Sequence, residues 1–158
     1  MTGKRRNVIN AIRNASMACF VLAMALVLCV PGNGFCGSSN DPEEKALLQA
    51  ARNFLDAEVR RDYPAIYACF ASSSPYVRSH SYEQYLAEVQ ALPNRIIEYR
   101  IVSVSYIQDN EEKKKLPAVE KIAQVEVELK FLHADTQELS GINIGFVFFK
   151  ERGRWYKS

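Results

Sequence analysis

The hydrophobic periodicity of this chain changes once, close to residue 93, and this change limits the folds open to it. Before it, apolar residues recur at helical spacing, as in the series Leu47, Ala50, Phe54 and Ala57. After it, β-branched and aromatic residues alternate with polar ones, as in strands with one buried face. Helices followed by strands predict an α+β fold, with three N-terminal helices packed on a curved four-stranded antiparallel sheet.

Capping residues indicate where the three helices begin. Asp41 precedes a proline and two glutamates, which is the composition expected at a helix N-terminus. Asp62, or the tyrosine after it, begins a second helix, and residues 72–80 are predicted to form a loop. Ser81 and Gln84 have the spacing of a capping box and predict the start of the third helix.

The second half predicts four antiparallel strands, at residues 96–107, 119–132, 141–150 and 155–158. The second strand alternates cleanly, and its predicted buried side chains are Ala123, Val125, Val127, Leu129 and Phe131. The charged run 111–115 is interpreted as a solvated hairpin loop. A curved sheet around the first helix would bury the apolar stripe that contains Phe54 and leave a cleft at its open end.

The N-terminal 36 residues have the order of a secretory signal. A basic stretch precedes an apolar run at 16–30, and small residues and turn formers follow. The run is about 15 residues long, short of the roughly 20 that span a bilayer as a helix, although an uncleaved anchor remains an alternative. The predicted organisation is a signal peptide at 1–36, a linker at 37–41 and one domain at 42–158, exported to the periplasm or secreted.

The cysteines leave two interpretations of the processing site open. Cys36 stands just after the apolar run, as the acylated cysteine of a lipoprotein does, but Phe35 before it departs from the small residue usual there. The alternative is ordinary cleavage within residues 32–37. A membrane is therefore expected as a partner only if Cys36 is lipidated or the signal is uncleaved. Cys69 lies in an apolar helical pattern and is expected to be a free, buried thiol.

Charge argues against nucleic acid as a partner. The formal net charge is +2, but residues 1–36 hold four basic side chains and no acidic one, so the rest has 16 basic and 18 acidic side chains. A nucleic-acid-binding domain usually has a strongly basic face.

The domain resembles the nuclear transport factor 2-like superfamily, whose broad fold is also called cystatin-like, in its uncharacterised secreted or envelope branch. The segments that carry the resemblance are AARNFLDAEVRRDYPAIYACFA at 50–71, the later SYEQYLAEV and the closing GFVFFKERGRWYKS. The resemblance covers about residues 42–158. It implies a cone-shaped fold and a homodimer formed through the sheet, but it is almost silent on function because the superfamily includes isomerases, dehydratases and transport factors.

The resemblance also allows the isomerase chemistry to be tested at particular positions. When Asp62 is aligned with the aspartate at the corresponding corner of the ketosteroid isomerases, their oxyanion-donating tyrosine falls on Phe54, which has no hydroxyl. Their catalytic aspartate falls near Arg78, and a guanidinium cannot accept a proton at neutral pH. Isomerase chemistry by that route is therefore disfavoured, and no catalytic residue is assigned.

The sequence favours a non-catalytic domain that binds a small apolar ligand or an envelope protein through its cleft or its sheet face. Tyrosines gather on the segments expected around the cleft, where they either cap the rim of the core or contact a ligand. The candidate ligand-binding residues are Tyr67, Tyr85, Tyr99, Phe54 and His80. The alternative is a cofactor-free lyase or isomerase, with Tyr67, His80 and Glu98 as weak acid–base candidates. Glu98 and Arg100 are more simply explained by ion pairs on the wet face of the sheet. No metal site and no cofactor are predicted, because the sequence holds no ligand motif.

Overall fold

The computed structural model describes residues 41–158 of this chain. The predicted signal peptide, the candidate lipidation site Cys36 and nearly all of the predicted linker lie outside these residues. Within the described part of the chain, no helix is both long enough and apolar enough to cross a membrane.

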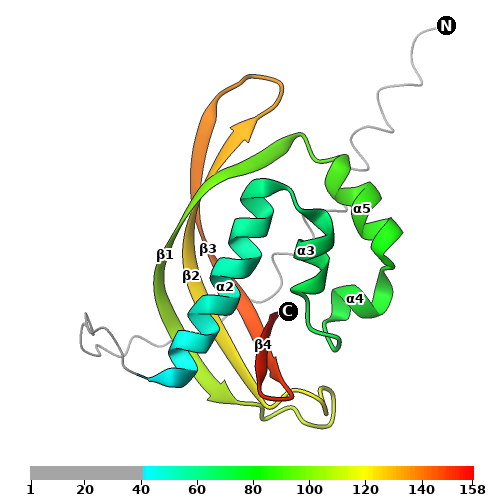
Figure 1. Ribbon diagram of the computed structural model, residues 1–158, viewed down its shortest axis with the longest axis vertical. Coiled ribbons are helices and arrows are strands. Elements are labelled where there is room, and N and C mark those ends of the chain that lie inside the picture. Colours follow the sequence, from blue (N-terminus) through cyan, green and yellow to red (C-terminus); the bar gives the residue numbers. More distant parts are fainter. Residues whose placement is uncertain (1–40) are drawn as a thin grey trace, which may run out of the picture. The chain divides into compact units, whose positions relative to one another are not determined.

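The described residues form an α+β fold, as predicted, with four helices followed by four strands (Figure 1). In chain order they are α2 (Pro42–Arg60), α3 (Tyr63–Ala68), α4 (Pro75–Ser79), α5 (Tyr82–Gln90), β1 (Asn94–Asp109), β2 (Lys121–His133), β3 (Leu139–Glu151) and β4 (Arg154–Lys157). The helices lie on one side of a sheet that curves around α2 (Figure 1). This is the α+β arrangement that the sequence predicts.

One short helix was not predicted. α4 lies within residues 72–80, which the sequence pattern assigned to a loop. Pro75 stands in its first turn, where proline is well tolerated, but a helix of five residues is too short to show an apolar period. The prediction for this segment is therefore wrong, and the number of helices in the described residues is four instead of three.

The predicted helix starts are confirmed by hydrogen bonds. The Asp41 side chain accepts from the Glu43 N–H at 2.9 Å, and the Asp62 side chain accepts from the Ala65 N–H at 3.2 Å. At the start of α5 the capping box is complete, since the Ser81 N–H donates to the Gln84 side chain at 2.8 Å and Ser81 Oγ accepts in return. These caps fix the directions of the helices that surround the cleft.

The sheet has the strand order β1-β2-β3-β4, and every neighbouring pair is antiparallel. β1 has 16 residues and β2 has 13, and the register between them shifts at three places. The extra β1 residues at these shifts are Ile97, Val102 and Ser105. Each such bulge bends its strand and increases the local twist, so β1 follows the curve around α2.

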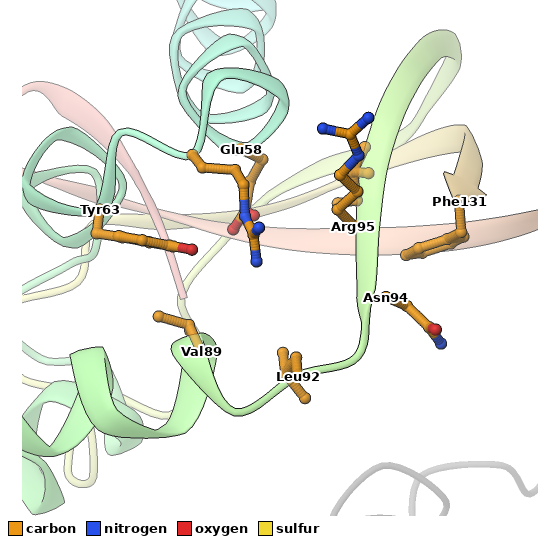
Figure 2. A pocket seen from close by; sticks show the side chains of 9 residues that line it. Glu58, Tyr63, Val89, Leu92, Asn94, Arg95 and Phe131 are labelled. Atoms are coloured by element: carbon orange, nitrogen blue, oxygen red, sulfur yellow. The ribbon is translucent and has the colours of Figure 1, made fainter. Parts of the chain in front are cut away.

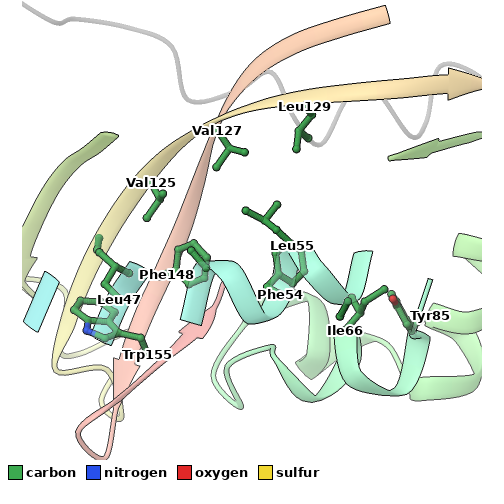
Figure 3. Packing of buried hydrophobic residues seen from close by; sticks show 13 residues of the cluster. Leu47, Phe54, Leu55, Ile66, Tyr85, Val125, Val127, Leu129, Phe148 and Trp155 are labelled. Atoms are coloured by element: carbon green, nitrogen blue, oxygen red, sulfur yellow. The ribbon is translucent and has the colours of Figure 1, made fainter. Parts of the chain in front are cut away.

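The core lies between α2 and the concave face of the sheet (Figure 3). Leu47, Phe54 and Leu55 of α2 are buried against strand residues such as Val127 and Phe148. The predicted alternation in β2 is confirmed, because Ala123, Val125, Val127 and Leu129 are all buried while Glu126 and Glu128 point to the other face.

A buried carboxylate joins the helical layer to the end of the sheet. Glu151, the last residue of β3, is 6% exposed. Its side chain accepts hydrogen bonds from the Ser72 hydroxyl at 2.7 Å, from the Ser73 N–H at 3.1 Å and from the Ser73 hydroxyl. Beside this contact, Ala71, Val119 and Phe149 form a second, smaller buried cluster. The segment between α3 and α4 is thereby tied to the turn between β3 and β4.

Candidate functional site

A hollow of about 140 Å³ lies where α2 and α5 end and β1 begins (Figure 2). We call it the open-end hollow. It is lined by Glu58, Arg61, Tyr63, Val89, Leu92, Asn94, Arg95, Ile96 and Phe131. Four of these side chains are apolar, and they come from α5, the segment after it, β1 and β2. The site therefore combines an apolar wall with one acidic and two basic groups.

Glu58 is the titratable acid of the open-end hollow. It follows Phe54 by one helical turn, so both side chains project from the same side of α2. Burial raises the pKa of its carboxyl group from 4.5 to about 7, although the positive charge of Lys157 opposes the rise. Among residues 41–158, the Glu58 side chain has no hydrogen-bond or ion-pair partner. A proton on this group is therefore exchanged near neutral pH.

Lys157 brings a positive charge into the same interior. Burial lowers its pKa to about 8, and the negative charge of Glu58 opposes that change. Its ammonium group lies 6.0 Å from the ring centroid of Phe70 and 5.6 Å from that of Phe146, and it donates to the carbonyl of Ser158. Burial thus shifts both pKa values toward the uncharged forms, since it outweighs the attraction between the two groups.

A second hollow lies beside the first, and we call it the side hollow. It has a volume of about 200 Å³ and is lined by Arg61, Pro93, Arg95, Leu132, Ala134 and Gln137. The two hollows share two lining residues, Arg61 and Arg95. Arg61 ends α2 in the left-handed conformation, with φ 56°, and its guanidinium carbon lies 5.9 Å from the ring centroid of Tyr63.

The structure places three of the five sequence candidates, Phe54, Tyr67 and Tyr85, in one aromatic cluster. The Tyr67 ring lies 5.3 Å from those of Tyr82 and Tyr85, centroid to centroid, and Phe54 lies edge-on to Phe70 at 6.1 Å. Tyr85 is 3% exposed, and its hydroxyl has no hydrogen-bond partner among the described residues. Neither Phe54, Tyr67 nor Tyr85 lines the open-end hollow, so their contact with a ligand stays a prediction.

The remaining candidates lie away from the open-end hollow. The Tyr99 hydroxyl donates to Asp56 at 2.7 Å and links β1 to α2. His80 is stacked on Tyr76 with 4.4 Å between ring centroids, and its Nε2 lies 3.4 Å from a Glu88 carboxylate oxygen. Tyr67 donates to the backbone carbonyl of His80 at 3.0 Å.

Glu98 lies on the outer face of the sheet, where it forms an ion pair of 2.8 Å with Lys130. Its neighbour on the same face, Arg100, pairs with Glu128, so the ion pairs predicted for this face are present. The weak acid–base candidates Tyr67, His80 and Glu98 are thus not brought together in one pocket. Glu58, the acidic residue of the open-end hollow, was missed by the sequence analysis.

Two other features of the described part of the chain bear on chemistry. Within residues 41–158 no group of three or more histidine, cysteine or acidic side chains could hold a metal ion. Cys69 is a half-buried free thiol, and burial raises its pKa.

The solved structures that are similar to this chain include the following two. One is a protein of unknown function with a cystatin-like fold from Nostoc punctiforme, with a TM-score of 0.47 and 15% sequence identity over 72% of this chain and 84% of that one. The other is a ketosteroid isomerase-like protein from Erwinia carotovora atroseptica, with a TM-score of 0.44 and 17% identity over 74% of this chain and 92% of that one. No protein-family model and no curated protein sequence matches the chain. Its function has to be inferred from its own residues.

Proposed function

We propose that this protein binds a small, largely apolar molecule in the open-end hollow. The observation that carries the proposal is the position of Glu58, whose half-buried carboxyl group faces a hollow with an apolar wall of Val89, Leu92, Ile96 and Phe131 (Figure 2). Ligand sites are commonly apolar concavities with a few polar groups that fix the orientation of the ligand.

The free energy of the fold supports this proposal. An ionised carboxylate is costly to bury without a partner, and a well-packed apolar side chain at the same position would avoid that cost. Residues that break local rules in this way are expected at functional sites more than elsewhere. The outer sheet face offers less support for a binding role, because its charged side chains Glu98, Arg100, Glu128 and Lys130 are paired with one another.

The place of action is a second part of the proposal. The basic, apolar and small-residue order of residues 1–36 supports export to the periplasm or beyond, with a lipid on Cys36 as the alternative to simple cleavage. The intact mass of the protein isolated from its own envelope tests this part. A start between residues 33 and 38 without added mass indicates a secreted chain, a diacylglyceryl mass on Cys36 indicates a lipoprotein, and an uncleaved N-terminus contradicts both.

Binding is tested with a neutral apolar probe, 1-hexanol, in a titration followed by amide NMR. We expect the largest shifts at residues that line the open-end hollow. Leu92, which is 57% exposed, can be replaced by tryptophan with little effect on folding, and the larger ring should fill the hollow and weaken binding about tenfold or more.

The matched control is Val102→Trp, because Val102 is 51% exposed and lies on a β1 bulge away from both hollows. It should leave hexanol binding unchanged. Equal losses in Leu92→Trp and Val102→Trp, or shifts that avoid the open-end hollow, would contradict the proposal.

A second candidate function is acid–base catalysis, and the pKa of Glu58 near 7 favours it. A carboxylate in this position could remove a proton from carbon next to a carbonyl group. Deuterium exchange into cyclohexanone in D₂O tests this chemistry. Exchange that is faster with the wild-type protein than with Glu58→Gln would support an enzyme, whereas equal rates would leave binding as the function.

A further inference from the structure

Arg61 and Arg95 stand at the junction of the two hollows. Each lines both the open-end hollow and the side hollow, and no other residue does so. Arg61 comes from the corner after α2 and Arg95 from the start of β1, so the fold places two arginines that are far apart in sequence around the same two hollows.

Neither of these two arginines has an acidic partner, in contrast to four basic residues of the sheet. Arg100 pairs with Glu128, Lys130 with Glu98, and Lys121 and Lys150 both pair with Glu43. Within the described residues neither Arg61 nor Arg95 forms an ion pair, although Glu58 lines the same open-end hollow. Two positively charged side chains therefore line one cavity without an ion-pair partner.

Guanidinium groups suit one class of ligand in particular. Their planar, forked donors match the oxygens of a carboxylate or a phosphate and bind them through two parallel hydrogen bonds. The apolar wall formed by Val89, Ile96 and Phe131 lies in the same hollow and suits an aliphatic or aromatic body.

We infer that the ligand of the open-end hollow is an amphipathic anion, with its apolar body against this wall and its carboxylate or phosphate head bound by Arg61 and Arg95. The inference rests on the proposed binding function and specifies its ligand class. The side hollow then gives room for a substituent on the head group, because it continues from the same two arginines.

The backbone conformation of Arg61 allows its side chain to be removed with little effect on the fold. Its φ of 56° lies in the left-handed region, which glycine adopts at little cost, so Arg61→Gly removes the guanidinium without disturbing the corner. Arg152, in the turn between β3 and β4, has a φ of 51° and lines neither hollow. Arg152→Gly therefore removes the same charge from the same backbone conformation at a distant place.

The experiment compares three probes with one alkyl chain, namely hexanoate, hexyl phosphate and hexanamide, in the full processed protein. Titrations at pH 6, where Glu58 is mostly protonated and does not repel an anion, give the three dissociation constants. We expect one of the anions to bind about tenfold more tightly than the amide, which corresponds to about 1.4 kcal/mol, and the tighter anion identifies the head group. Arg61→Gly and Arg95→Gln should each abolish this preference, and Arg152→Gly should keep it.

The outcomes separate this inference from the binding proposal itself. If hexanamide binds in the open-end hollow as tightly as both anions, the hollow takes neutral ligands and the inference is overturned while the proposed function stands. If Arg61→Gly and Arg152→Gly weaken anion binding equally, the effect is one of net charge and the inference is again overturned. If none of the three probes binds, both the inference and the proposed function fail.

Discussion

Replacing Glu58 by glutamine is expected to raise the free energy of unfolding by about 2 kcal/mol at pH 8 and to change it little at pH 4.5. The folded-state pKa of about 7 lies above the usual 4.5, and each pKa unit corresponds to about 1.4 kcal/mol, so the ionised carboxylate costs the fold about 3 kcal/mol. Glu58→Gln removes this cost, but part of the resulting stabilisation is offset because Lys157 loses a neighbouring negative charge.

The direction of this pH dependence follows from the number of protons bound by the folded and the unfolded protein. Between pH 4.5 and about 7 the folded protein holds a proton on Glu58 that the unfolded chain has lost, so stability falls as pH rises through this window. Lys157 acts in the opposite sense. Its pKa is about 8 when folded and 10.5 when unfolded, so stability rises with pH between these values. The two groups together predict a local minimum of stability between about pH 7 and pH 8. In Glu58→Gln the fall in stability between pH 4.5 and pH 7 should disappear.

Urea unfolding of the wild type and of Glu58→Gln from pH 4.5 to pH 8 measures this effect. Glu128→Gln is the matched control, because it removes one acidic charge from an exposed pair with Arg100 and should change stability by less than about 1 kcal/mol throughout. A Glu58→Gln protein that is no more stable than the wild type at pH 8 would show that Glu58 is not the costly buried acid inferred here.

Replacing Glu151 by alanine is expected to lower the free energy of unfolding by about 3 kcal/mol at pH 7. The carboxylate is buried and accepts three hydrogen bonds from Ser72 and Ser73, and hydrogen bonds to a charged group contribute about 1.5–3 kcal/mol each without adding fully. Burial opposes ionisation, but the serine hydrogen bonds outweigh it and hold the pKa of Glu151 below its usual value. This stabilisation is therefore present above pH 4.5 and is lost as pH falls through the lowered pKa.

Thermal and urea unfolding at pH 7 and in acid measure the effect of Glu151→Ala. Glu98→Ala serves as the control, since its ion pair with Lys130 is exposed and should contribute no more than about 1 kcal/mol. Equal losses in the two variants would mean that the contact between Glu151 and the serines does not hold the helical layer to the sheet. A loss for Glu151→Ala that stays constant into acid would contradict the role of the ionised form.

The fold was largely predictable because its signals are periodic. β2 alternates over residues 123–130, so both its position and its buried face follow from spacing alone. The caps at Asp41, Asp62 and Ser81 are local hydrogen-bond patterns that sequence shows directly. α4 has neither signal, since five residues make little more than one turn and the Ser74 side chain forms no capping bond.

The site was less predictable, although the sequence contained a usable signal. Glu58 continues the helical series of Ala51 and Phe54 at the next turn, so it places an acid on the buried stripe of α2. Lys157 follows Trp155 by two residues and shares its inward face in β4. A charged residue at a position where the periodicity predicts a buried side chain is thus a signal of a buried ionisable group. Glu58 and Lys157 lie in one interior because of the pairing of β3 with β4 and the path of α2. Spacing in the sequence alone does not predict these two features.

The three bulges of β1 have a consequence for how the cleft can change. Ile97, Val102 and Ser105 are supernumerary in the ladder, so deleting one of them would restore regular pairing without exchanging the inner and outer faces of the strand. The strand would straighten, while Arg95, Ile96 and the ion-paired face kept their chemistry. Single-codon deletions and insertions in β1 thereby provide an evolutionary route to a wider or narrower cavity, independent of the side chains that line it.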